Sequence, residues 1–100
     1  MGLALYGSSK GALSNLTKTM ALELGIAGIR VNAICPGFVD TPMTHNTLNE
    51  EQIKKILRRS INRRLIKPEE VADLTAFLLG PQAAMINGQS VFIDGGFSVI

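Results

Sequence analysis

A tyrosine and a lysine four residues apart near the start of the chain have the types and the spacing needed to move a proton. They are Tyr6 and Lys10, in the segment YGSSK at residues 6–10. Side chains at i and i+4 of a helix are neighbours, and a cation within about 4–6 Å favours the phenolate, which lowers the pKa of a tyrosine below its reference value near 10. Such a tyrosine can act as general acid or base on a carbonyl or an alcohol. An exposed helical pair without chemistry is the alternative that so short a pattern leaves open.

The elements that must position this pair begin with a long helix. Apolar residues at spacings of three and four predict a helix over residues 6–24 and a core stripe on one of its faces, made of Leu13, Leu16, Met20 and Leu24. Gly7 and Gly11 share a face of this helix. They either leave room for a partner helix or a cofactor, or are simply tolerated.

The rest of the chain alternates strands and helices, with about three helices and two strands in all. A near-continuous apolar run at residues 29–35 is typical of a buried parallel strand. A second helix is predicted over residues 46–67, with Asn49 as N-cap and Gln52 at N3. A third helix begins at Pro68, and residues 90–93 form a short last strand. The pattern predicts an α/β fold with a parallel sheet.

The segment PGFVDTP at residues 36–42 follows the first predicted strand directly. In open α/β sheets, ligands bind beyond the carboxyl ends of the strands, which places residues 36–44 at a cofactor edge. Gly37 would let the backbone approach a ring closely, and Thr41 offers a hydroxyl and an N–H group to an amide. An ordinary Pro-Gly turn is the alternative.

The second predicted helix is strongly basic. It holds seven of the ten lysines and arginines, namely Lys54, Lys55, Arg58, Arg59, Arg63, Arg64 and Lys67. Such a cluster can attract an acidic carrier protein, a phosphate-bearing acyl thioester or nucleic acid, although a solvated helix face is the interpretation that we prefer. No aromatic residue interleaves with these charges and the net charge is only +2, so no nucleic-acid partner is expected.

Composition bounds the remaining classes. With 46% hydrophobic and 18% charged residues over 100 positions, the chain is predicted to be one small globular domain. No apolar run reaches the roughly 18–20 residues that span a bilayer, so no membrane partner is expected and a cytoplasmic protein is the default. The lone Cys35 is interpreted as a structural thiol. His45 has no ligand partner at metal-binding spacing, so no metal site is predicted.

Residues 6–96 resemble the C-terminal part of a classical short-chain dehydrogenase/reductase. The matching segments, in order, are YGSSK, ALELGIAGIRVNAICPG, FVDTPM, PEEVADLTAFLL and INGQSVFIDGG. The resemblance implies the C-terminal portion of a Rossmann-type doubly wound parallel sheet. It also implies an NAD- or NADP-dependent interconversion of carbonyl and alcohol on a small molecule, as in 3-oxoacyl-carrier-protein reductases and related enzymes.

The resemblance also implies roles for individual residues. Tyr6 would exchange a proton with the substrate oxygen, while Lys10 would hold the nicotinamide ribose and lower the pKa of the tyrosine. Both would thus lie at the cofactor, and Asn32 would be a structural strand residue. The residues expected to contact the nicotinamide end of the cofactor are Pro36, Gly37, Val39 and Thr41.

In this family the glycine-rich phosphate loop and the catalytic serine lie upstream of the tyrosine, and only five residues precede Tyr6 here. We therefore expect a truncated chain, a single partial domain over residues 1–100, that is inactive alone. The strand predicted at residues 29–35 would lose neighbours in such a chain, so we also expect a homo-oligomer. Two other functions stay open. One is a noncatalytic oligomerisation or interaction module derived from such an enzyme, and the other is a basic accessory that docks an acidic carrier protein or nucleic acid.

Overall fold

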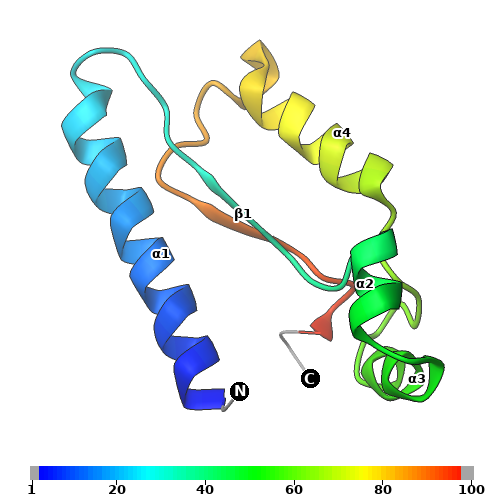
Figure 1. The fold of residues 1–100 in the computed structure, drawn as a ribbon. Helices are drawn as coiled ribbons and strands as arrows, with labels where there is room; N and C mark the ends of the chain where they lie inside the picture. The colour runs from blue at the N-terminus through cyan, green and yellow to red at the C-terminus, as the bar shows by residue number, and fades with distance from the viewer. Residues whose placement is uncertain (1–2, 98–100) are drawn as a thin grey trace. The chain divides into compact units, whose positions relative to one another are not determined.

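The computed structural model describes the backbone of residues 3–97 and the side chains of residues 9–97. Its elements are α1 (Leu3–Gly25), β1 (Ala33–Pro36), α2 (Pro42–Thr47), α3 (Glu50–Arg58), α4 (Pro68–Leu79), the short 3₁₀ helix η1 (Pro81–Ala83) and β2 (Ser90–Ile93). Figure 1 shows their arrangement and labels the four α-helices and β1. By contacts, the chain divides into two compact units. Unit 1 holds Met1–Ile34 and Leu78–Val91, and unit 2 holds Cys35–Phe77 and Phe92–Ile100.

β1 and β2 are the two strands of the sheet, and they lie side by side in Figure 1. At one end the Ala33 N–H donates to Gln89 O at 2.8 Å, and at the other end the Gly37 N–H donates to Ile93 O at 3.0 Å. Both residue numbers rise together from one bond to the next. The pair is therefore parallel, as the sequence predicts. The predicted last strand at residues 90–93 is confirmed.

The first strand begins four residues later than predicted, at Ala33 instead of residue 29. In unit 1, one backbone bond from the Gly88 N–H to Val31 O at 2.8 Å and several side-chain bonds fix the preceding residues. Asn32 Nδ2 donates to Ile86 O at 2.9 Å, and Asn32 Oδ1 accepts the Gln89 N–H at 3.1 Å. Asn87 Oδ1 accepts the Val31 N–H at 3.0 Å. These amide side chains take over part of the pairing that a longer strand would supply, so Asn32 has a structural role here.

The first helix is confirmed but its predicted core stripe is not. Leu13, Leu16 and Met20 are 42%, 55% and 38% exposed, and only Leu24 is half-buried. Among residues 9–25 of α1, the buried position is instead Thr17. Its hydroxyl donates a hydrogen bond to Leu13 O at 2.7 Å, so this buried polar group has a partner. The described part of the chain therefore leaves an apolar face of α1 uncovered.

The predicted helix over residues 46–67 is wrong in its extent. In unit 2, α2 ends at Thr47 and α3 spans only Glu50–Arg58. The start of α3 is as expected, because Asn49 accepts the Gln52 N–H at 2.8 Å and Gln52 returns a bond to the Asn49 N–H at 2.9 Å, which completes a capping box. Beyond Arg59 the N–H groups of Ile61 and Asn62 both donate to Gly95 O. This contact with the turn after β2 replaces the helical bonds and ends α3.

An ion pair closes the connection from α3 to α4. Arg64 contacts both carboxylate oxygens of Glu70, at 2.7 and 2.8 Å. Glu70 is the third residue of α4 and also accepts the Lys67 N–H at 2.9 Å, just before the helix begins at Pro68. The hydrogen bonds from Arg64, followed by the bond from Lys67, lower the pKa of Glu70 to about 2 from its ordinary 4.5.

This lowered pKa predicts a stability change in acid. A carboxyl whose folded pKa lies below its unfolded one adds stability above pH 4.5, and that contribution disappears as the pH falls from 4.5 towards 2. We expect Glu70→Gln to flatten the pH dependence of the unfolding midpoint within this window, measured by thermal melts. Glu69→Gln removes the same charge from the neighbouring residue and is the control. Equal flattening by both variants would contradict the prediction.

Candidate active site

Tyr6 and Lys10 both lie in α1, in unit 1. The helix is continuous through both positions, so the four-residue spacing places them on successive turns of one face, as predicted. Lys10 is half-buried and takes part in an interaction. The side chain of Tyr6 lies outside the described residues. The predicted proton donor thus has the required backbone placement.

The predicted cofactor residues follow the carboxyl end of β1, in unit 2. Pro36 is the last residue of the strand. Beyond it the chain stays extended and pairs with Ile66, because Ile66 N–H donates to Phe38 O at 3.0 Å and Asp40 N–H donates to Ile66 O at 2.7 Å. Val39 forms the centre of this parallel bridge. Pro36, Gly37, Val39 and Thr41 therefore lie together along one extended segment.

Gly37 lies too close to its neighbour for any larger residue, which the sequence alone does not indicate. A Cβ atom built on it would lie 2.9 Å from Asp94 Cβ and 3.1 Å from Asp94 Cα. Real Cβ atoms essentially never approach another heavy atom below 3.0 Å. The close neighbour in the described structure is thus the residue after β2, and glycine is what allows the ends of the two strands to meet there.

The Thr41 hydroxyl is used inside the chain. Thr41 is the N-cap of α2, and its Oγ1 accepts the Thr44 N–H at 3.3 Å. The Thr44 hydroxyl donates in turn to Val39 O at 2.6 Å. These bonds fix the backbone between Val39 and Thr44, and Pro42 at the start of α2 limits it further.

Two backbone donors in this segment have no acceptor within the described residues. The N–H groups of Val39 and Thr41 donate to none of residues 3–97, whereas the neighbouring Asp40 N–H is bonded to Ile66. Both residues are half-buried. Partly shielded N–H groups tend to find a partner, so these two groups are candidate donors to a ligand or to water.

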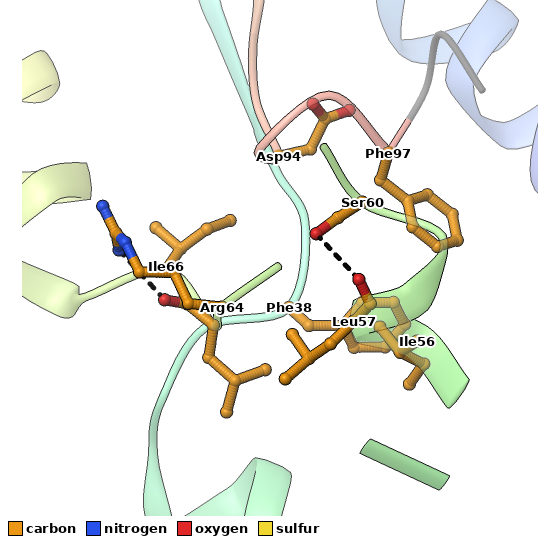
Figure 2. A pocket seen from close by; sticks show the side chains of 9 residues that line it. Phe38, Ile56, Leu57, Ser60, Arg64, Ile66, Asp94 and Phe97 are labelled. Carbon is orange, nitrogen blue, oxygen red and sulfur yellow. Dashed lines mark hydrogen bonds between the residues drawn. The ribbon is translucent and has the colours of Figure 1, made fainter. Parts of the chain in front are cut away.

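Phe38 anchors the segment from within unit 2. The Phe38 ring contacts the Phe97 ring edge to face, with centroids 5.9 Å apart. The Arg59 guanidinium lies over the Phe97 ring, 5.2 Å from its centroid. Figure 2 shows Phe38 and Phe97 together with Ile56, Leu57 and Ile66 around a gap of about 10 Å³. That volume holds at most one water molecule, so the gap is too small for an organic ligand.

His45 is paired with a carboxylate. Its Nε2 lies 2.6 Å from Asp40 Oδ1. The short helix α2 brings His45 close to Asp40, which directly precedes the N-cap Thr41. Both side chains are more than half exposed. Sequence analysis overlooked α2, although Thr41-Pro42 is a helix-start signal of N-cap threonine followed by proline.

The described residues offer neither a metal-binding cluster nor a membrane-spanning helix. No group of three or more His, Cys, Asp or Glu side chains among them is arranged to hold a metal ion. No helix among them is long and apolar enough to cross a membrane. Cys35 is half-buried and free.

Comparison with known proteins places these features in context. A family model described as "Enoyl-(Acyl carrier protein) reductase" matches residues 1–98. A tropinone reductase homologue of Arabidopsis thaliana is 42% identical over 97 residues, which cover 96% of this chain and 35% of the relative. The chain thus spans about a third of the length of this curated relative.

Solved structures share the fold. A variant of a Serratia marcescens short-chain dehydrogenase/reductase has a TM-score of 0.85 and 45% identity, covering 97% of this chain and 39% of that one. A 4-hydroxyisoleucine dehydrogenase solved with NADH has a TM-score of 0.86 and 35% identity, covering 97% and 40%. The predicted α/β fold, as the C-terminal portion of a Rossmann-type sheet, is confirmed.

Proposed function

Because the chain belongs to the short-chain dehydrogenase/reductase family, we propose that it is the catalytic-tyrosine part of an oxidoreductase that interconverts a carbonyl and an alcohol on a small molecule with NAD or NADP. The observation that supports a cofactor role best is the pair of N–H groups on Val39 and Thr41, which have no acceptor among residues 3–97. They follow the carboxyl end of a parallel strand, where α/β sheets bind ligands.

Membership of the family suggests a role for each of the predicted residues. The N–H groups of Val39 and Thr41 donate to the carboxamide of the nicotinamide, and Pro36 and Gly37 fix the backbone that carries them. Tyr6 gives its phenolic proton to the substrate oxygen during reduction and takes it back during oxidation. Lys10 holds the ribose and favours the phenolate. When bound, the cofactor supplies the hydride to the carbonyl carbon or accepts it from the alcohol.

We further propose that these 100 residues do not turn over substrate by themselves, since they contain no glycine-rich loop of the kind that cradles a dinucleotide pyrophosphate. The purified chain is expected to show no oxidation of NADH or NADPH with ketone or oxoacyl substrates in a spectrophotometric assay. A fusion to an upstream segment of the family that carries the phosphate loop and the serine should restore turnover. Tyr6-dependent turnover by the chain alone would refute this proposal.

A noncatalytic oligomerisation module is the second candidate, and the uncovered face of α1 favours it. Leu13, Leu16 and Met20 lie three or four residues apart along this face and are exposed in the described chain. Exposed apolar groups of this kind often mark interfaces. A homo-oligomer serves either candidate, so light scattering alone does not separate them. Failure of every fusion to turn over substrate, together with stable self-association, would favour the module.

A further inference from the structure

The basic residues of α3 are not spread evenly over a solvated face. Lys54 and Arg58 lie one helical turn apart, and both line an open hollow of about 200 Å³ in unit 2. Leu57 supplies the apolar wall, and Arg63 completes the lining from the turn after the helix. The hollow therefore has three cationic side chains, one apolar side chain and no acidic one.

Arg63 reaches this hollow through an unusual backbone conformation. Its φ is +53°, the only positive φ of a non-glycine residue in the described part of the chain. Few non-glycine residues adopt this region, and arginine has no local hydrogen bond that favours it. The buried Ser60 holds the turn, because its Oγ accepts the Arg63 N–H at 3.0 Å. A strained position that brings a third cation to two others points to a ligand.

The three cations are not neutralised by the residues that the structure describes. Lys54, Arg58 and Arg63 form no ion pair with any described carboxylate, in contrast to Arg64, which pairs with Glu70. Like charges one helical turn apart destabilise a helix. A doubly charged anion at their centre would remove this repulsion and accept hydrogen bonds from all three side chains.

We propose that this hollow binds the phosphate group of an organic phosphate ester, with Leu57 against the organic part. Charge, concavity and a single apolar wall favour one compact anion over an extended acidic surface. No aromatic side chain lines the hollow on which a base could stack. The phosphate site stands independently of the proposed function. Only the step that identifies the phosphate ester as the substrate of the reaction rests on that function.

The test is a titration of the whole chain with butyl phosphate at low salt, followed by amide chemical shifts in NMR spectra. We expect saturable shifts centred on residues 54–63 and an affinity that falls as salt is added. Lys54→Ala and Arg58→Ala should each weaken binding about fivefold or more. Lys55→Ala, which removes the same charge from the next residue of α3, should change it less than about twofold.

Arg63→Gly separates binding from folding. Glycine accepts a φ of +53° without strain, so this variant should bind butyl phosphate more weakly while its unfolding midpoint is not lowered. Arg63→Lys keeps the charge and should retain part of the affinity. If Arg63→Gly binds as well as the parent chain, Arg63 is not a ligand and the proposal fails.

Titrations with three other compounds identify the class of ligand. Butanol should not bind, and equal binding of butanol would overturn the proposal. Inorganic phosphate that binds as tightly as the ester would support the phosphate site and assign it to free phosphate. A polyglutamate peptide that binds more tightly with the same variant dependence would overturn it in favour of an acidic protein. Because no turnover is measured, these outcomes are independent of whether the fused enzyme reduces a carbonyl.

Discussion

In an active fusion, Tyr6→Phe is expected to lower kcat about 10²-fold or more. The substitution removes the exchangeable proton and keeps the ring, so cofactor binding and folding should change little. The loss should therefore fall on the chemical step, which single-turnover absorbance measurements of NADH or NADPH report directly. A fusion that works equally well with phenylalanine at position 6 would show that the proton comes from another group.

Substitutions of Lys10 in the same fusion test its predicted role in binding the cofactor and lowering the pKa of the tyrosine. Lys10→Ala should weaken cofactor binding and move the activity profile to higher pH, because the phenol loses the cation that favours its ionised form. Lys10→Arg keeps the charge but presents a planar fork in place of a compact ammonium, so partial rescue is expected. Lys18→Ala, further along α1, is the matched control and should change neither quantity.

Features that depend on neighbours in the sequence were predictable. The capping box of Asn49 and Gln52 needs only residues three apart, and the start of α4 at Pro68 follows from the fixed φ of proline and its missing N–H. The last strand was found because a short apolar run ends at a turn signal. The family segments were also visible, because their order along the chain carries the resemblance.

Features that depend on distant contacts were not predictable. The apolar periodicity continues past Arg59 to Ile61, but Gly95 O accepts the N–H groups of Ile61 and Asn62 and so ends the helix. Ile61 is consequently 62% exposed and not part of a helical stripe. Arg63 is an exception among local features: Ser60, which holds its left-handed conformation, is only three residues away, but arginine itself has no preference for that conformation and so gave no signal.

The role of Gly37 shows how such a contact connects to the site. From sequence it could be interpreted as room for a cofactor ring, whereas the described structure places Asp94 against it. The segment that carries the Val39 and Thr41 donors begins at this contact. The position of those donors therefore depends on the packing of the β1 end against the residue after β2.

Gly37→Ala is accordingly expected to destabilise the chain by about 1–3 kcal/mol, the usual cost of overpacking a tight contact. The added Cβ would meet both Cβ and Cα of Asp94 at about 3 Å, and a backbone atom cannot turn away as a long side chain can. The measurement is urea unfolding followed by circular dichroism. In the active fusion, the same shift of backbone should also raise the KM for the cofactor.

Gly11→Ala is the matched control, because a Cβ at Gly11 meets no described atom within 4 Å. In the middle of α1 it should stabilise the chain, by up to about 1 kcal/mol through helix propensity. Opposite signs for these two glycine substitutions would support a steric origin for the Gly37 effect. If Gly37→Ala were as stable as the parent chain, the strand ends would not meet as described, and the donors of Val39 and Thr41 would lose the contact that positions them.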